Sequence, residues 1–233
     1  MSKKEEYIND LNKSFSEGVN SIKWTDEPSD EDLDTMRQTP SYMTIDWWNI
    51  LPEPPANNSQ VTIDELKYIA SKTKTISYED FELVQLVDKD PLDLFLRHLN
   101  MFGLQFPAYE FKEAYKNTLE PIILNLKWKF KRPRPYQLAD KFNVDINVIE
   151  TDTHQTPAYP SGHAAYGGLI ASMLSDLYPK HSSEFYHLAS LIEKARILQG
   201  VHYPTDNDAG MLIASAVWQD IRYNIFPNLK IGD

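Results

Sequence analysis

Residues 160–179 read PSGHAAYGGLIASMLSDLYP, and this stretch decides how the second half of the chain is expected to fold. A helix should open at Gly162, directly after a polar turn, and should end at Pro179, which cannot continue it. Within it the apolar residues recur at helical spacing: Leu169, Ile170, Met173, Leu174 and Leu177.

Helical signals continue on both sides of this stretch. We expect further helices around residues 62–70, 81–86, 91–99, 106–131, 183–198 and 204–222, with Thr62 as the cap of the first. Gly200 stands where a helix C-terminus favours a left-handed residue. The only alternating, strand-like run, residues 144–149, is short. The sequence therefore predicts an all-α protein, a single-domain helical bundle.

Composition limits the classes of function. A chain of 233 residues with 42% hydrophobic residues is long enough for one domain with a full core. Its net charge of -11 argues against binding nucleic acid or anionic membranes. The absence of cysteine excludes disulfides and a thiol nucleophile. A homo-oligomer is compatible with this composition.

The two ends of the chain lead to expectations about compartment and domains. No apolar signal segment follows Lys3 and Lys4, and the uncharged stretch 209–219 is about half as long as a membrane span, so we expect a cytoplasmic protein with no membrane span. Residues 1–40 are polar and acidic and are expected to form a loosely ordered arm, with a helical domain over residues 41–233.

Three polar clusters stand out against this acidic background. Together they supply three cations, two histidines, a carboxylate and a glycine turn, which suits the capture of a tetrahedral oxyanion and its attack by an imidazole. The clusters are Lys127 with Arg134-Pro135, then Pro160-Ser161-Gly162-His163, then Arg196 with His202 and Asp206.

The first two clusters each have a plainer interpretation. Lys127 and Arg134 would share one face of a continuous helix, but with Lys129, Lys131 and Arg132 they could equally form a solvated basic helix end. A helix N-terminus led by Ser161 and Gly162 is an anion site, or simply an ordinary N-cap.

The third cluster also has two interpretations. Asp206 can bond one ring nitrogen of His202 and leave the other free to attack. Alternatively, the segment from Arg196 to Asp206 is a corner between two helices, with Asp206 at the helix dipole.

Taken together, the clusters resemble a known signature. Six residues separate Lys127 from Arg134-Pro135, Pro-Ser-Gly-His follows, and an arginine, five residues, a histidine, three residues and an aspartate complete the pattern. This arrangement is similar to that of the type 2 phosphatidic acid phosphatase superfamily, which includes bacterial nonspecific acid phosphatases and vanadium haloperoxidases. The resemblance covers residues 127–206, about a third of the chain, and departs from the pattern at Ala195, where a serine is usual. Residues 51–59 resemble the proline-rich segment of class A acid phosphatases.

The resemblance implies a mechanism without a metal or other cofactor. It assigns phosphate binding to Lys127, Arg134, Ser161, Gly162 and Arg196. His202 would be the nucleophile, oriented by Asp206, and His163 would protonate the leaving group and later activate water. The substrate would be a small phosphorylated molecule. The remaining histidines fall outside the pattern and are expected to be surface or structural residues: His98, His154, His181 and His187.

Two alternatives remain open at this point. The same residues could hold vanadate in a haloperoxidase, and the run from Pro157 to Ala164 resembles those enzymes, although Thr156 stands where they commonly have an aromatic residue or histidine. A binding module on a degenerate scaffold is the non-enzyme alternative, and the presence of every implied catalytic residue speaks against it.

Overall fold

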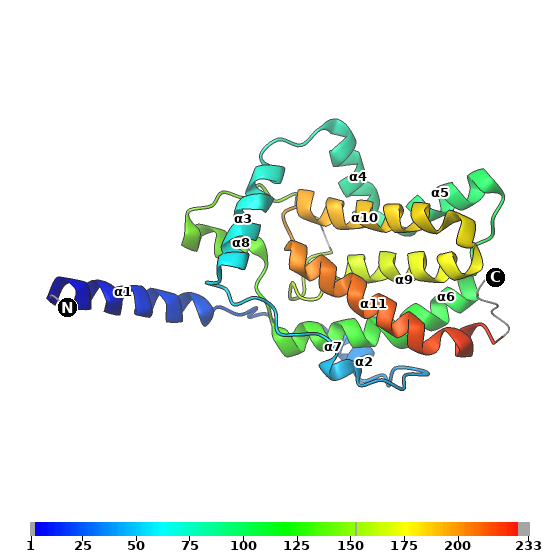
Figure 1. The fold of residues 1–233 in the computed structure, drawn as a ribbon, viewed down its shortest axis with the longest axis horizontal. Helices are drawn as coiled ribbons and strands as arrows, with labels where there is room; N and C mark the ends of the chain where they lie inside the picture. The colour runs from blue at the N-terminus through cyan, green and yellow to red at the C-terminus, as the bar shows by residue number, and fades with distance from the viewer. Residues whose placement is uncertain (1–2, 152, 228–233) are drawn as a thin grey trace.

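In the computed structural model, which describes residues 3–151 and 153–227, the chain is helical and the described part contains no strand (Figure 1). The all-α prediction is confirmed. The helices are α1 (Lys3–Asn20), α2 (Asp30–Met36), α3 (Gln60–Thr73), α4 (Tyr78–Lys89), α5 (Leu92–Phe102), α6 (Ala108–Ala114), α7 (Glu120–Phe130), α8 (Pro135–Ala139), α9 (Gly162–Leu177), α10 (Ser182–Leu198) and α11 (Pro204–Ile225).

Helix α9 forms the centre of the core. It packs along both α10 and α11, which run beside it (Figure 1). Its apolar residues are buried on all sides, so the helix has no solvent face of the kind a surface helix shows. The start of α9, the end of α10 and the start of α11 therefore meet at one end of the bundle, and the three polar clusters converge there.

Helices α9 and α11 approach each other closely because Gly210 has no side chain. A Cβ atom on Gly210 would lie 2.5 Å from the carbonyl oxygen of Ser161 and 3.0 Å from the amide of Ala165. The amide of Ser161 also donates to the backbone carbonyl of Asp206, at 2.9 Å. The residue before α9 and the first turn of α11 are thus joined backbone to backbone.

Several local predictions need adjustment. Ser59, not Thr62, caps α3, because the Ser59 hydroxyl accepts the amide of Thr62. Pro121 stands in the first turn of α7, where a proline is tolerated, and the long helical region predicted there runs as α6, a π-helical turn over Tyr115–Leu119 and α7. Gly200 has a φ of 80°, as expected for a left-handed residue after a helix.

The strand-like run 144–149 forms no strand within the described residues, since no second strand lies beside it. Its backbone is instead held by helix ends. The amide of Ile149 donates to the carbonyl of Gln199, at 3.1 Å, and the amide of Asn147 donates to the hydroxyl of Thr73, at 3.2 Å.

The N-terminal region contains two helices that the sequence analysis did not predict. Helix α1 extends away from the body (Figure 1), and near its C-terminal end the Asn57 amide group donates to the carbonyl of Val19, at 2.9 Å. Helix α2 lies against α7, where Asn125 donates to the carbonyl of Met36, at 3.0 Å. The division at residue 40 stays a prediction, and its outer limits, residues 1–2 and 228–233, lie outside the described residues.

None of the helices in the described ranges is long and apolar enough to cross a membrane.

Candidate active site

The first cluster is not carried on one continuous helix. Lys127 lies in the last turn of α7, which ends at Lys131, a residue with the left-handed φ of 49°. Arg134 follows in extended backbone, before Pro135 opens α8. The two cations nevertheless converge, because the chain turns back at Lys131. Both are buried, so the solvated helix end is not what the structure shows.

His202 and Asp206 lie together at the start of α11. Nδ1 of His202 is 3.1 Å from Oδ2 of Asp206, and Nε2 is 2.7 Å from Nη1 of Arg134. A guanidinium can only donate, so Nε2 accepts and the ring proton belongs on Nδ1, where it is donated to Asp206. His202 is therefore a neutral imidazole whose Nε2 carries the lone pair.

Asp206 is held by more partners than the sequence analysis expected. Its Oδ1 accepts from Arg132 Nη1, at 2.6 Å, and its Oδ2 accepts the amide of Tyr203, at 2.9 Å. Arg132 also reaches Glu65 on α3, at 3.3 Å, and its guanidinium carbon lies 3.9 Å above the centre of the Tyr203 ring. Arg132 is thus a buried partner of Asp206, not the surface cation of the plainer interpretation.

Backbone carbonyls orient the cations of the first cluster. Lys127 Nζ donates to the carbonyl of Pro157, at 2.5 Å. Arg134 donates to the carbonyls of Thr156 and Val201, both at 2.9 Å. These neutral acceptors fix the side chains without cancelling their charges, so the charges are left to act on an anion.

Arg196, near the end of α10, has a carboxylate partner. Its Nη1 donates to Oδ1 of Asp88 on α4, at 3.1 Å, while its Nε and Nη2 are buried without a hydrogen-bond partner. Asp88 Oδ1 also accepts the hydroxyls of Thr151 and Thr153. Buried guanidinium N–H groups without acceptors are costly, and a phosphoryl oxygen would satisfy them.

The second cluster forms the start of α9. The Ser161 hydroxyl accepts the amide of Ala164, at 3.3 Å, so it serves as the N-cap. A Cβ atom on Gly162 would meet only Ile123, at 3.7 Å, and Lys127, at 3.9 Å. The protein itself leaves space in front of this backbone, which favours close approach by a ligand.

A cavity of about 370 Å³ joins these groups. Its inner wall includes Lys127, Arg134, Gly162, His163 and His202. No hydrogen bond to the ring of His163 is found in the described part of the chain, so this ring is available to a substrate. The structure thus brings all eight predicted residues to one end of the bundle, five of them in one cavity wall.

Burial and the convergent cations govern protonation here. Burial lowers the pKa of both His163 and His202 well below 6.5, and Arg196, Lys127 and Arg134 lower both further. Burial also lowers the pKa of Arg134 to about 9 and that of Arg196 to about 10. A bound dianion would reverse these effects, because it favours the charged form of every neighbouring cation.

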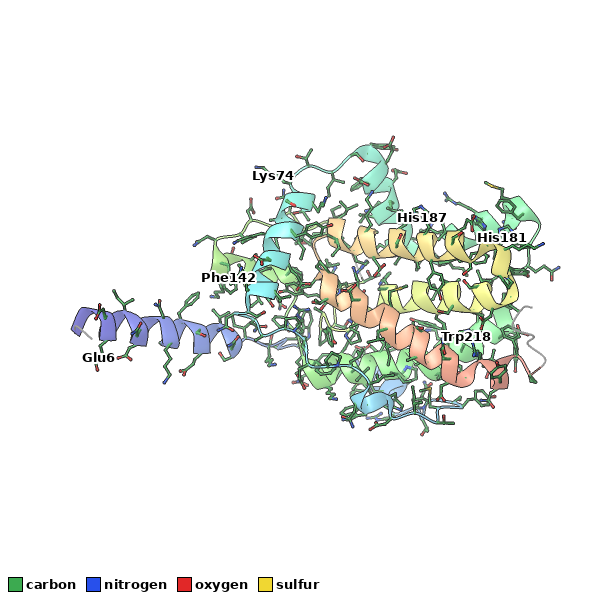
Figure 2. All side chains as sticks on the ribbon, viewed as in Figure 1. Glu6, Lys74, Phe142, His181, His187 and Trp218 are labelled. Carbon is green, nitrogen blue, oxygen red and sulfur yellow. The ribbon has the colours of Figure 1, made fainter. Side chains whose placement is uncertain are left out.

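The other histidines lie outside this wall. His98 on α5 contacts His181, with ring nitrogens 3.3 Å apart, and His187 is exposed on α10 (Figure 2). His154 is nearer to the site than predicted: burial, then Arg134 and Arg196, lower its pKa.

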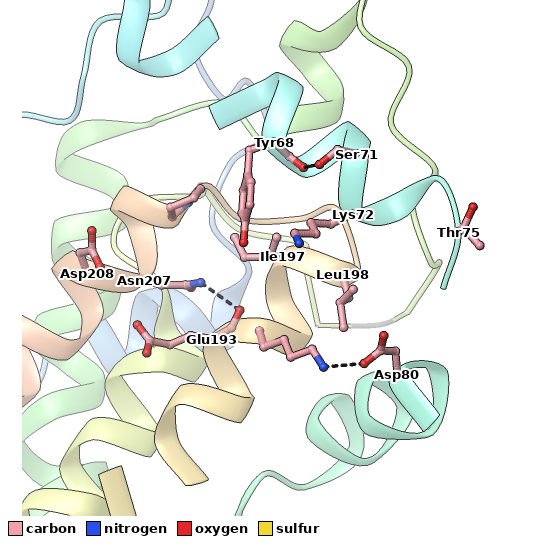
Figure 3. Close-up of a pocket in the computed structure, with 12 residues that line it drawn as sticks. Tyr68, Ser71, Lys72, Thr75, Asp80, Glu193, Ile197, Leu198, Asn207 and Asp208 are labelled. Carbon is pink, nitrogen blue, oxygen red and sulfur yellow. Dashed lines mark hydrogen bonds and ion pairs between the residues drawn. The ribbon is translucent and has the colours of Figure 1, made fainter. Parts of the chain in front are cut away.

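A second cavity, of about 650 Å³, lies between α3, α10 and α11 (Figure 3). None of the eight predicted residues lines it. Glu193 and Asp208 line it from adjacent helices, and the Asn207 side chain donates to the carbonyl of Glu193, at 3.1 Å.

Within the described residues, no three or more histidine, aspartate or glutamate side chains are grouped so that they could hold a metal ion.

Comparison with known proteins finds acid phosphatases that are similar to part of this chain. A non-specific acid phosphatase of Salmonella typhimurium is 33% identical over 89 residues, which are 37% of this chain and 34% of the relative. An acid phosphatase of Zymomonas mobilis is 34% identical over 118 residues, 51% of this chain and 44% of the relative. A non-specific acid phosphatase of Providencia stuartii is 30% identical over 99 residues, 42% of this chain and 39% of the relative. The chain thus covers from 34% to 44% of the length of these curated relatives.

The family model of the PAP2 superfamily matches residues 117–229, a range that contains all three clusters. The helical fold is the one expected of that family, and the acid phosphatases are distant homologues of the chain. Residues 117–229 of the chain therefore match the PAP2 superfamily.

Proposed function

We propose that the protein is a metal-independent acid phosphatase that hydrolyses phosphate monoesters through a phosphohistidine at His202. One observation carries the proposal: Nε2 of His202 is a lone-pair nitrogen at a cavity wall shared with Lys127, Arg134 and His163. A nucleophile, an acid and anion-binding cations are the parts that phosphoryl transfer to histidine requires.

In the first half-reaction, the cations bind the non-bridging oxygens of the phosphate. Lys127, Arg134 and Arg196 supply charge, and the backbone at Gly162 supplies an N–H at the start of α9. Nε2 of His202 attacks phosphorus, the ester P–O bond breaks, and His163 gives its proton to the departing oxygen. Asp206 stabilises the imidazole as it becomes positively charged.

In the second half-reaction, the neutral His163 takes a proton from water, which attacks phosphorus. The P–N bond breaks and inorganic phosphate leaves. No metal is required in this scheme, because the three cations supply the charge stabilisation that a metal would give.

The test is hydrolysis of p-nitrophenyl phosphate in excess EDTA. We expect activity that chelation does not affect and that low concentrations of vanadate inhibit, because trigonal-bipyramidal vanadate resembles the transition state. Loss of activity on chelation, restored by magnesium or zinc, would reject the mechanism. Bromination with vanadate and peroxide, in place of hydrolysis, would favour the haloperoxidase.

The roles of the two histidines can be separated by trapping the phosphoenzyme. His202→Ala should form none, whereas His163→Ala should still be labelled by p-nitrophenyl phosphate, whose leaving group departs without much protonation. His187→Ala, exposed on α10, is the matched control and should behave as the wild type. Equal loss of labelling in His163→Ala and His202→Ala would mean that the roles are wrongly assigned.

A further inference from the structure

The side chains that line the cavity in front of His202 are cationic at its base and mainly anionic at its mouth. At the base, Lys127 and Arg134 are buried. Towards solvent, carboxylates from three separate elements also line it: Asp32 on α2, Asp90 before α5 and Glu120 on α7. Asp90 is exposed and the other two are half-exposed, so the acids stand at the mouth.

Two of these carboxylates are not neutralised by a cation. Glu120 pairs with Lys116, at 2.6 Å. Asp32 accepts only the backbone amide of Ser29, at 3.3 Å, and Asp90 accepts that of Leu92, at 3.0 Å. Neither has an ion-pair partner among the described residues. Both line the cavity without a neutralising cation, whereas Asp88, deeper in it, is paired with Arg196.

The charges at the mouth act on the interior of the site. Asp32 favours the protonated form of Lys127, against the burial that lowers the pKa of this amine. Burial raises the pKa of Tyr166, and Asp90 raises it further. The one cation that lines the mouth, Lys89, is on an exposed and flexible side chain.

An aromatic wall completes the mouth. Tyr115 and Tyr166 both line the cavity and are half-buried, with ring centres 4.8 Å apart and planes at 83°. The Tyr115 ring already has the Lys116 ammonium 5.5 Å from its centre, so this wall is one beside which a cation lies. Aromatic rings beside carboxylates favour an ammonium group, through cation–π attraction added to ion pairing. The same surroundings disfavour a second anionic group on a substrate.

We infer that the phosphatase proposed above is selective for small phosphate monoesters whose leaving group carries an ammonium group, that is, phosphates of amino alcohols. This inference rests on the proposed function. The phosphate dianion is held at the cationic base, and the ammonium group lies at the mouth among Asp32, Asp90 and the tyrosine rings. Hydrolysis gives inorganic phosphate and the free amino alcohol. A cavity of about 370 Å³ suits such a compact substrate.

The test compares three esters of equal length: 2-aminoethyl phosphate, 2-hydroxyethyl phosphate and carboxymethyl phosphate, with p-nitrophenyl phosphate as the reference. We expect kcat/KM to be about tenfold higher for the aminoethyl than for the hydroxyethyl ester, since an ion pair with half-exposed Asp32 and one with exposed Asp90 each contribute a factor of a few. The carboxymethyl ester should be the poorest of the three.

The three esters also differ in intrinsic reactivity. This difference is the same for every variant, so it cancels when a variant is compared with the wild-type protein. In Asp32→Asn/Asp90→Asn the ratio of aminoethyl to hydroxyethyl kcat/KM should fall by about threefold to tenfold. The matched control is Asp34→Asn/Asp93→Asn, which removes the same charge from the same two regions outside the cavity lining, and it should keep the wild-type ratio.

The outcomes separate the two proposals. If wild-type protein fails to hydrolyse p-nitrophenyl phosphate, the proposed function is wrong. If it hydrolyses this ester but shows no preference for the aminoethyl ester, the substrate class is wrong. If the preference persists in Asp32→Asn/Asp90→Asn, the assignment of the ammonium site to these two carboxylates is wrong, and in both cases the proposed function stands.

Discussion

Nη1 of Arg134 lies 2.7 Å from Nε2 of His202, the nitrogen proposed to attack phosphorus. The same contact that identifies this nitrogen as an acceptor also occupies its lone pair. For reaction to occur, the guanidinium has to turn its N–H from the imidazole to a phosphoryl oxygen. In the proposed mechanism, substrate binding and exposure of the nucleophile are thus a single event in which Arg134 exchanges one acceptor for another.

Arg134→Ala should lower kcat/KM by about 10²- to 10³-fold, the usual cost of removing one donor to a developing anion. The pKa of His202 should rise, because Arg134 is the largest of the cationic influences that add to the effect of burial. Steady-state kinetics measure the first effect, and nitrogen-15 NMR of the imidazole follows the second, since wild-type His202 should show a protonated Nδ1 near neutral pH. The titration of His98, on α5, serves as the internal control. An unchanged His202 titration would contradict the contact.

Asp88 is predicted to be a positioning residue for Arg196. Asp88→Ala should raise KM and the vanadate inhibition constant by about tenfold or more, because the guanidinium loses the partner that orients it. Asp88→Asn keeps an oxygen for the Arg196 N–H and should recover part of the loss. The control is Asp80→Ala, on the same helix, whose partner is Lys194. If Asp88→Ala and Asp80→Ala behave alike in steady-state kinetics, the positioning role is wrong.

Arg132→Ala should lower the free energy of unfolding by about 3–5 kcal/mol, since it leaves the buried Asp206 and Glu65 carboxylates without their cation. Urea denaturation measures this difference. Arg37→Ala, which breaks an exposed pair with Asp34, should cost less than about 1 kcal/mol. Similar midpoints for the two variants would show that Arg132 contributes little to stability.

The pH dependence should be bell-shaped on the acid side of neutrality, and its alkaline limb should differ between kcat/KM and kcat. Burial, then Arg196 and Lys127, lower the pKa of His163 well below 6.5, whereas a bound phosphate dianion offsets those cations and raises it. The alkaline limb of kcat, which reports the complex, should therefore lie about one pH unit or more above that of kcat/KM for an alkyl phosphate. The limbs belong to the coupled set of groups. Coincident limbs would contradict the assignment of His163 as acid.

Glu193, at the second cavity (Figure 3), should make stability fall as the pH rises. Burial, with Asp208 adding to it, raises the pKa of Glu193 from 4.5 to about 7. The folded state then holds a proton that the unfolded state releases between these values, so stability is lost across that window. Because the side chain is partly exposed, Glu193→Gln should gain only about 1 kcal/mol at pH 8 and close to nothing at pH 4. Thermal unfolding at the two pH values, with exposed Glu82→Gln as control, would detect this; an equal gain at both would rule out the titration of Glu193.

The sequence predicted those parts of the fold that depend on local periodicity. The helix that starts at Gly162 and ends before Tyr178 follows from its apolar spacing and from Pro179, and the turn at Gly200 follows from its lack of a side chain. Helix α1 was missed although Ile8, Leu11, Phe15 and Val19 recur every three to four residues, because the many polar and acidic residues of the N-terminal region were interpreted as a loosely ordered arm. The alternation in residues 144–149 is a local pattern, and it carries no information on whether a second strand lies beside them in the fold.

In the candidate site, the motif spacing predicted which residues converge but not what holds them. Asp88 lies 39 residues before Lys127 in the chain and belongs to no motif, and it reaches Arg196 only because α4 packs on α10. Glu65 reaches Arg132 from α3 in the same way. Arg132 itself had a signal that the prediction did not use: it stands between Lys131 and Pro133, where the chain leaves its helix and turns inward. The chemical roles of the eight predicted residues stay predictions that the experiments above can test.

The backbone contact at Gly210 has a consequence for how this site can change over evolutionary time. His163 and His202 are carried at the starts of α9 and α11, and the distance between those two starts depends on a residue with no side chain. Even the smallest enlargement, to alanine, would force the proposed nucleophile and acid apart, although none of the proposed reacting residues would itself be substituted. The residues at the mouth of the cavity, on α2 and α7 and before α5, can therefore be substituted and alter substrate preference. The residues where α9 and α11 cross stay under constraint.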